Sequence, residues 1–279
     1  MSVLCDVMQV SRSGYYVAID RPLSQKTQRE NRLLLEVKTL AKTSHHSYGS
    51  RRMAKALQQK GYAVGRSAAR SLMQKAAVEC KQRRRYSVTT QSQHDFRIAE
   101  NVLNREFMVD TPNRVWITDI TYLWTEEGWL YLAGVVDLFS RRVVGWAMAD
   151  HMREALIQDA LQMALARRHP EPGLLHHSDR GVQYASDHYR ATLKSAGILV
   201  SMSRSGNCWD NAVMERVWGS LKSERTDGKM YTTREEGKKE VIDYFEMFYN
   251  SIRLHSTLGY KSPMQFENEF LLKNVSTFT

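Results

Sequence analysis

The sequence predicts a mixed α/β domain preceded by a basic, all-helical region, and charge and periodicity both support this division. Residues 1–105 carry 20 Lys and Arg against 7 Asp and Glu, whereas residues 106–279 carry 20 against 23. Past Pro112, helical apolar spacing gives way to segments rich in β-branched and aromatic residues. We therefore expect a basic helical region at 1–105, an α/β core at 106–227 and a C-terminal helical tail at 228–279.

Composition excludes several classes of protein. The longest apolar stretch, 129–136, ends at Asp137, so no membrane span is expected. No basic stretch followed by an apolar run marks a secretory signal at the N-terminus. The three cysteines, Cys5, Cys80 and Cys208, form no Cys-x-x-Cys pair. This spacing argues against a zinc finger or a disulfide scaffold and suits a reducing cytoplasm.

The basic region predicts a nucleic-acid partner, with a solvated basic surface as the alternative. Helices are expected near the start, at 30–42, at 51–60 and at 66–78, and the last two, joined by a glycine-bearing turn, are typical of a helix-turn-helix at about 48–80. Any two amphipathic helices can imitate this motif. The residues expected to contact double-stranded DNA are Arg51, Arg52, Arg66, Arg70, Gln74, Lys81, Arg83, Arg84 and Arg85.

The pattern of residues 106–227 predicts a sheet covered by helices on both faces. Strands are expected at 115–124, 130–136, 142–148, 174–178 and 198–202, and helices at 153–168, 186–196 and 211–222. The first three strands form a meander, and helices alternate with the last two strands. This order predicts a layered α/β fold.

Three acidic residues lie at positions where the folding of the chain does not require a carboxylate. Asp119 lies in the middle of a strand, where an unpaired carboxylate is costly, and Asp179 follows a buried strand. Glu215 shares a helix stripe with Gly219 and Lys222. Converging carboxylates without cysteine favour Mg²⁺ or Mn²⁺, and two such ions can promote in-line displacement at a phosphodiester. Taken singly, each carboxylate could instead pair with an arginine, cap a helix or be solvated.

The spacing of these carboxylates resembles a known pattern. Asp179 and Glu215 have 35 residues between them, and Asp119 precedes them on the first strand. The chain resembles the second-reading-frame (OrfB) product of insertion sequence 3 transposases, which has a retroviral-integrase-type DDE core. The segments that carry the resemblance are 10–16, 48–52, 112–122, 136–141, 177–184, 203–212, 215–222 and 249–263.

The resemblance implies an RNase H-like catalytic core in which Asp119, Asp179 and Glu215 are catalytic and bind the metal, with Lys222 contacting DNA. It implies cleavage at the end of a mobile element and direct transfer of the freed 3′ hydroxyl to another strand. The implied partners are the terminal repeats and target DNA, a second copy of the chain, and the product of the upstream frame (OrfA), which carries a coiled coil that this sequence lacks. The implied location is the bacterial cytoplasm, at the nucleoid.

Two alternatives stay open from the sequence. One is an RNase H-like nuclease that hydrolyses without joining, and the other is a DNA-binding regulator that is inactive without the upstream product. Asp137 is expected to form a local ion pair, with a role as a fourth metal ligand as the alternative. The histidine pairs at 45–46 and 176–177 lack cysteines at ligand spacing and are expected to be structural or to face DNA. Arg253, His255 and Tyr260 are expected to fold back on the core.

Overall fold

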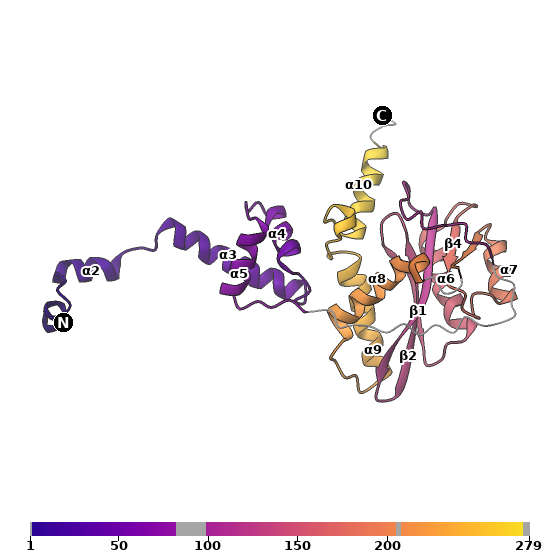
Figure 1. The fold of residues 1–279 in the computed structure, drawn as a ribbon, viewed down its shortest axis with the longest axis horizontal. Coiled ribbons are helices and arrows are strands. Elements are labelled where there is room, and N and C mark those ends of the chain that lie inside the picture. The colour runs from indigo at the N-terminus through magenta and orange to yellow at the C-terminus, as the bar shows by residue number, and fades with distance from the viewer. Residues whose placement is uncertain (1, 82–98, 205–207, 276–279) are drawn as a thin grey trace. The chain divides into compact units, whose positions relative to one another are not determined.

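The structure is a computed structural model that describes residues 2–81, 99–204 and 208–275 (Figure 1). The chain forms two compact units. The first comprises Met1–Thr43 and Gly49–Glu79, and the second comprises Ser44–Tyr48 and Cys80–Thr279. The short segment Ser44–Tyr48 thus belongs to the second unit, where the Tyr48 hydroxyl donates to the carbonyl of Ile252 (3.1 Å) and accepts from the amide of Leu254 (2.9 Å).

The first unit is helical. Its helices are α1 (Ser2–Val7), α2 (Arg12–Asp20), α3 (Gln25–Thr43), α4 (Ser50–Gln59) and α5 (Arg66–Lys75). A second helix in the opening segment, α2, was not expected from the sequence. Ser11 precedes it, and its side chain caps the helix by accepting from the amide of Gly14. Helices α4 and α5 bury Met53, Leu57 and Leu72 on facing sides. The predicted pair of helices around a glycine-bearing turn is therefore confirmed.

The second unit is built on a five-stranded mixed sheet in the order β3-β2-β1-β4-β5. The strands are β1 (Val115–Thr125), β2 (Gly128–Asp137), β3 (Val143–Ala149), β4 (Leu175–Ser178) and β5 (Leu199–Met202). The first three form the expected antiparallel meander, while β4 runs parallel to both β1 and β5. The parallel pairing of β4 with β1 places the carboxyl end of β4 beside the middle of β1.

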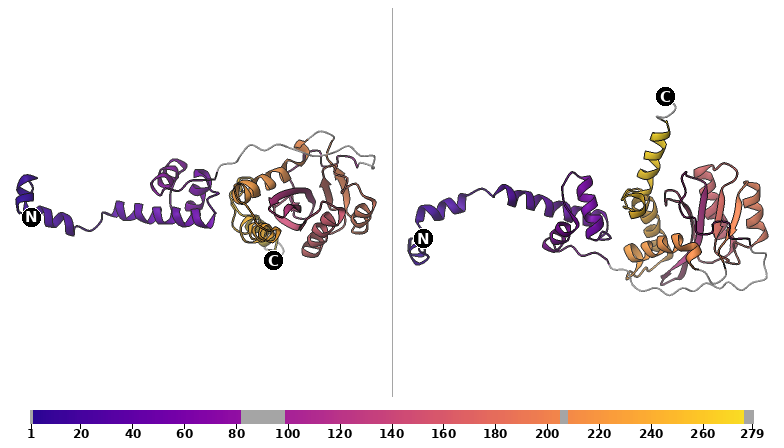
Figure 2. Two further views of the ribbon diagram at one scale, coloured as in Figure 1. Left: turned by 90° about the horizontal axis from the view of Figure 1, so that it is seen from below. Right: turned by 45° about the horizontal axis from the view of Figure 1, so that its top comes forward.

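Helices cover both faces of this sheet, as the sequence predicts (Figures 1 and 2). The helices α6 (Glu154–Arg168) and α7 (Asp187–Ser195) lie on one side, and α8 (Ala212–Leu221), α9 (Arg234–Ile242) and α10 (Pro263–Val275) lie on the other. Between α6, α7 and the sheet lies a core that includes Trp116, Val135, Leu156, Leu161 and Tyr189, all almost fully buried. Burial of large side chains on this scale is the main source of the stability of the fold.

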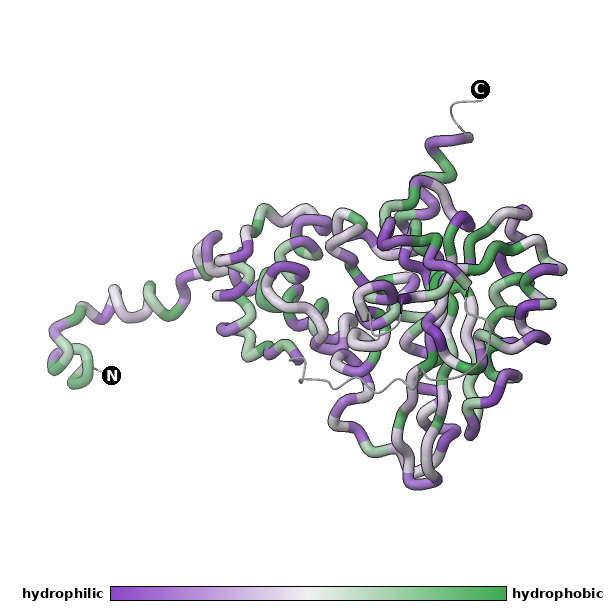
Figure 3. Tube along the Cα trace, turned by 45° about the vertical axis from the view of Figure 1, so that its right-hand side comes forward, coloured by the Kyte–Doolittle hydropathy of each residue, from purple (hydrophilic) through white to green (hydrophobic). Residues whose placement is uncertain are grey.

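Apolar and polar residues are interspersed along the helices (Figure 3). Within residues 2–81, 99–204 and 208–275, no helix is long and apolar enough to cross a membrane.

Gly145 of β3 permits the close approach of α6 to the sheet. A Cβ atom at this position would meet the backbone oxygen of Ala160 and lie 2.8 Å from the Cβ of Ala164. Because backbone atoms cannot swing aside, we expect Gly145→Ala to lower the free energy of unfolding by about 1–3 kcal/mol. Urea unfolding monitored by circular dichroism measures this. The matched control is Gly65→Ser, since Gly65 caps α5 with open space around it; an equally stable Gly145→Ala would contradict the packing argument.

Candidate active site

Asp119 lies in the middle of β1, opposite Gly134 of β2. Its Oδ1 accepts from the amide of Ile120 (2.8 Å), and its Oδ2 accepts from the indole Nε1 of Trp218 on α8 (3.1 Å). Trp218 reaches this position because Gly134 has no side chain: a Cβ there would lie 2.6 Å from the indole ring. The glycine opposite Asp119 thus makes room for the side chain that holds it.

Asp179 directly follows β4. The last parallel pair between β1 and β4 is Ile117 with His177, and Asp119 and Asp179 each lie two residues beyond it. The backbone therefore brings the two aspartates to neighbouring positions, at the carboxyl end of β4, where α/β sheets place their ligands. The amide of Gly181 donates to the Oδ1 of Asp179 (2.9 Å) and orients the carboxylate.

Glu215 lies in the first turn of α8, which packs against β1. Trp218, three residues later on the same helix, donates the hydrogen bond to Asp119. Since residues three apart share one side of a helix, this bond fixes the side of α8 that carries Glu215 relative to Asp119.

The three carboxylates interact electrostatically. The pKa of Asp119 is raised well above its usual range, first by burial, then by the negative charge of Asp179 and to a smaller extent by that of Glu215. Across the described part of the chain, no three His, Cys, Asp or Glu residues are already gathered as a metal site. The carboxylates are therefore close enough to repel one another but are not a closed set of ligands. A divalent cation would relieve this repulsion, and an all-oxygen donor set suits Mg²⁺ or Mn²⁺.

Lys222 begins the π-helical turn η2 (Lys222–Thr226), directly after α8. Its ammonium lies 5.1 Å from the centre of the Tyr122 ring. Burial lowers the pKa of Lys222, while Tyr122, Asp227 and Asp119 act in the opposite direction. Lys222 is thus within electrostatic reach of the acidic residue at the centre of the site.

The residues expected to contact DNA in the first unit lie mostly at its surface. Arg66, Arg70 and Gln74 are exposed on α5, whose larger apolar residues are buried. On α4, Arg51 is exposed and Arg52 is half-buried. This arrangement is what a groove-reading helix requires.

The remaining basic candidates follow the first unit. The Nζ of Lys81, in the second unit, donates to the backbone carbonyl of Glu224 (2.9 Å), so its ammonium has a structural contact in addition to any with DNA. The candidates Arg83, Arg84 and Arg85 lie outside the described residues.

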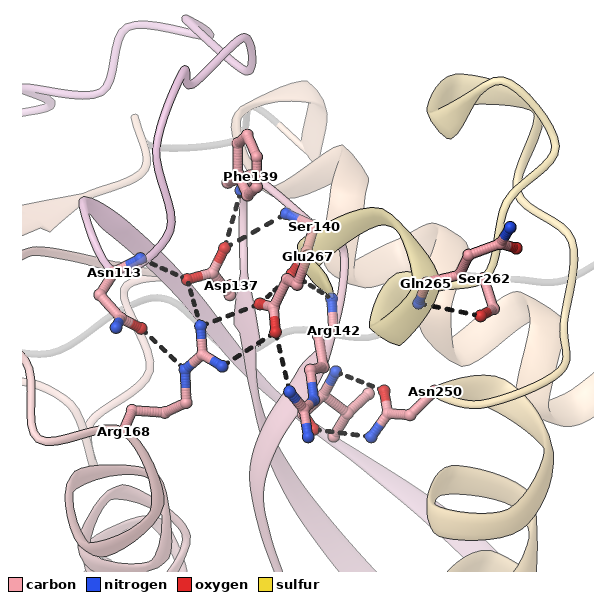
Figure 4. A network of polar contacts seen from close by, with 11 residues as sticks. Asn113, Asp137, Phe139, Ser140, Arg142, Arg168, Asn250, Ser262, Gln265 and Glu267 are labelled. Atoms are coloured by element: carbon pink, nitrogen blue, oxygen red, sulfur yellow. Dashed lines mark hydrogen bonds and ion pairs between the residues drawn. The ribbon is translucent and has the colours of Figure 1, made fainter. Parts of the chain in front are cut away.

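Asp137 is the centre of a buried polar network (Figure 4). Its carboxylate accepts from the amides of Asn113 (2.7 Å) and Phe139 (3.0 Å) and lies 3.8 Å from a guanidinium nitrogen of Arg168 on α6. The same guanidinium donates two hydrogen bonds to Glu267 of α10. The expectation of a local ion pair is therefore corrected: the cationic partner comes from α6, because that helix ends beside the carboxyl end of β2.

The second histidine pair is structural. His176 and His177 are fully buried in β4, and burial lowers the pKa of His176 to about 3 and that of His177 to about 4. A nitrogen of His177 lies 2.9 Å from the Ser201 hydroxyl, and the Nε2 of His176 lies 3.0 Å from the Tyr189 hydroxyl. Of the two readings of this pair, the structural one is confirmed.

Two residues near the site escaped sequence reasoning. Trp218 lies at apolar helical spacing on α8, and nothing in this spacing indicates that its indole nitrogen reaches Asp119. Asp210, in the 3-10 turn η1 (Cys208–Asn211) before α8, is fully buried and accepts from both Arg204 and Arg105. The arginine hydrogen bonds lower the pKa of Asp210 below its usual range. These contacts of Asp210 fix the start of the helix that carries Glu215. In the sequence, only the charged residues on both sides of the Gly-Asn segment indicate them.

The C-terminal tail packs against α8, the helix that carries Glu215. Arg253 thus folds back on the core, as the sequence predicts. The guanidinium of Arg253, only 4% exposed, donates to Glu224 (2.7 Å) and to the hydroxyl of Ser220 on α8 (2.9 Å). A ring nitrogen of His255 lies 3.1 Å from the same guanidinium.

The chain is similar to several known proteins. Residues 109–208 and 215–271 match integrase core domain families, and residues 28–86 match an HTH-like domain family. The chain is 42% identical to the "Insertion element IS600 uncharacterized 31 kDa protein" of Shigella sonnei, over 96% of this chain and 98% of that protein. It is 39% identical to the transposase InsF for insertion sequence IS3A of Escherichia coli K12, over 97% of this chain and 95% of that protein. Among solved structures, the HTLV-2 integrase catalytic core domain in complex with magnesium is 17% identical over 56% of this chain and 97% of that chain, with a TM-score of 0.42.

Proposed function

The chain belongs to the insertion sequence 3 family of transposases and is a DDE-type transposase, and we propose that Asp119, Asp179 and Glu215 are the residues that carry its strand cleavage and strand transfer. One observation supports this assignment above the others. Asp119 on β1 and Asp179 after the parallel strand β4 lie at neighbouring positions, and burial together with the charges of Asp179 and Glu215 raises the pKa of Asp119. Functional sites are where such perturbed carboxylates concentrate.

The same three carboxylates would hold the divalent metal, Mg²⁺ or Mn²⁺, and two ions suit the chemistry. When bound, such ions polarise the scissile phosphate and lower the pKa of the attacking water or hydroxyl. The chain's own contribution is to place the ligands. Hydrogen bonds from Ile120 and Trp218 hold Asp119, the amide of Gly181 orients Asp179, and α8 carries Glu215.

The basic residues would position the DNA. The exposed face of α5, with Arg66, Arg70 and Gln74, fits the groove of a terminal repeat, and Arg51 and Arg52 fit its phosphates. Lys222 would contact the strand at the acidic site, as would Lys81, Arg83, Arg84 and Arg85 along the backbone. We infer that two copies of the chain bring two element ends together, that the upstream-frame product assists them, and that this occurs on chromosomal DNA in the bacterial cytoplasm.

The test of this function is a nicking and joining assay on DNA that contains an element end. We expect products of cleavage and joining that require Mg²⁺ and increase when the upstream-frame product is added. Cleavage without joining in all conditions would favour a nuclease, and DNA binding without cleavage in all conditions would favour a regulator.

The pH at which activity falls on the acidic side is expected to depend on the Mg²⁺ concentration. The pKa of Asp119 is raised by burial and by the charges of Asp179 and Glu215, so this carboxyl takes up a proton at a higher pH than an ordinary aspartate. A protonated carboxyl is a poor ligand, and activity should therefore fall as pH drops through this raised pKa. Because protons and cations compete, a higher Mg²⁺ concentration should move the fall to lower pH. Rates measured against pH at two Mg²⁺ concentrations check this; an acid limb at the same pH in both would contradict it.

A further inference from the structure

A pocket of about 290 Å³ lies at the turn end of the β1–β2 hairpin, between the hairpin and the segment that follows α8. Its walls include Tyr122, Trp124 and Trp129 from the hairpin, and Lys222 and Tyr231 from the other side. It lies wholly within the second unit. None of the carboxylates proposed for catalysis lines it, so it is a separate feature next to the acidic site.

The hairpin side of the pocket is aromatic and open to solvent. Trp124 and Trp129 are cross-strand partners, and their rings meet edge to face at 4.7 Å between centroids. Tyr122 packs against Trp129 in the same way at 4.8 Å. Trp124 is nevertheless 59% exposed and Trp129 43% exposed. A cross-strand aromatic pair stabilises a hairpin, but two indoles with this much free surface also offer flat faces for stacking.

The polar groups of the pocket are mixed in sign. Lys222 and Lys229 line it together with Glu126 and Asp227, and Lys229 is paired with Glu240 at 2.6 Å. A site with two cations and two carboxylates does not suit a bare phosphate. It suits a flat ring that has hydrogen-bond donors and acceptors on its edge and a phosphate attached, as a nucleotide does.

Tyr231 closes the pocket on the side away from the hairpin. Its side chain lines the pocket and is only 6% exposed, and its hydroxyl is buried. The charges of Glu240 and Arg225, which do not line the pocket, act on this hydroxyl. The exposed aromatic surface of the pocket therefore comes from the hairpin.

Lys222 connects the pocket to the acidic site. Its ammonium lies over the ring of Tyr122 in the pocket wall and is within electrostatic reach of Asp119. Tyr122 is three residues from Asp119 on β1, so the two side chains leave opposite faces of the strand, and Lys222 is the residue near both. A DNA strand held at the carboxylates could therefore place an adjacent nucleotide in the pocket.

We propose that this pocket binds one unpaired nucleotide of the DNA strand held at the acidic site, with its base against Trp124 and Trp129 and its phosphate beside Lys222. The proposal deepens the proposed function, since it takes the ligand to be the strand on which the carboxylates act. It assigns to the hairpin the capture of a base that has left the double helix. Such capture would keep a strand end splayed open next to the site of cleavage.

The test uses the full chain and a single-stranded thymidine oligonucleotide that contains one 2-aminopurine, in EDTA. Stacking quenches the 2-aminopurine fluorescence, and its titration gives the dissociation constant. We expect Trp129→Ala to weaken binding by roughly 5- to 100-fold, the range for loss of one base-stacking contact. Trp129→Phe, which keeps an aromatic face at the same position, should weaken binding less than Trp129→Ala. Leu199→Ala, which shortens an exposed side chain of β5 outside the pocket, is the matched control.

A measurement on the unaltered chain keeps the proposal testable even if a hairpin variant fails to fold. An oligonucleotide with 5-iodouracil in its unpaired segment is crosslinked by light, and the modified peptide is identified by mass spectrometry. We expect crosslinks within 122–129 or 222–231. Crosslinks confined to other segments, or equal affinity of Trp129→Ala and wild type, would overturn the proposal.

The outcome is independent of catalysis. Binding is measured without divalent ions, so it does not need the metal that the acidic residues would hold. Absence of strand transfer by the wild-type chain, with intact quenching, would count against the proposed function alone. Strand transfer by the wild-type chain without crosslinks at the hairpin would count against the pocket alone.

Discussion

Glu215→Gln is expected to lower strand cleavage and strand transfer by more than about 100-fold while leaving DNA binding intact. Loss of a residue that only supports a metal ligand already costs about 10- to 100-fold, so loss of a ligand itself should cost more. The amide keeps the shape of the side chain but removes the negative charge that binds a cation. The rate of appearance of nicked and joined products on an element end, together with a DNA-binding titration, measures both effects.

Glu235→Gln is the matched control for this variant. Glu235 lies in the first turn of α9 and is exposed, and its carboxylate lies 3.9 Å from the ammonium of Lys238. It should retain wild-type activity. Equal rates for Glu215→Gln and Glu235→Gln would remove Glu215 from the catalytic residues.

Arg253→Ala is expected to lower the free energy of unfolding by about 3–5 kcal/mol, because it leaves the buried carboxylate of Glu224 without its cation. Arg253 and Glu224 are 4% and 6% exposed, and two guanidinium nitrogens of Arg253 donate to Glu224 at 2.7 Å. The hydroxyl of Tyr244 donates to the same carboxylate (2.9 Å). Breaking this network should loosen the end of α8, since Arg253 also binds Ser220.

Urea unfolding followed by tryptophan fluorescence gives the change for Arg253→Ala. Lys239→Ala, at an exposed position of α9, removes one cation from the surface and should change stability by less than about 1 kcal/mol. If the two variants have the same midpoint, the tail does not anchor the helix that carries Glu215.

Much of the fold was predictable because its elements have clear periodicity. The segments rich in β-branched and aromatic residues at 115–124 and 130–136 match β1 and β2, and the helical spacing at 153–168 matches α6. The π-helical turns η2 and η3 (Asp243–Tyr249) were not predicted, because their spacing follows tertiary contacts such as that of Arg253 with Glu224. Similarly, the partner of Asp137 could not be read from the sequence, since Arg168 reaches it from another layer of the fold.

The candidate site was predictable in its residues but not in its supports. The three carboxylates stand out along the chain because an unpaired carboxylate costs free energy at such positions. One lies in the middle of a strand, one follows a buried strand and one lies on a helix. The groups that hold them do not stand out: Trp218 looks like any apolar residue on the inner side of α8, and Asp210 pairs with Arg105 across 105 residues. The hairpin pocket was also missed, because alternating aromatic residues on a strand look the same whether they stabilise a hairpin or face a ligand.

The most direct test of the central claim is a crystal structure of the full chain with Mn²⁺ and an element end, with the ions located by anomalous scattering. We predict manganese peaks within coordination distance of the carboxylates of Asp119, Asp179 and Glu215, and their absence from crystals of Glu215→Gln. Manganese bound elsewhere, with these three carboxylates uninvolved in the presence of DNA, would contradict the assignment of the acidic residues as the active site.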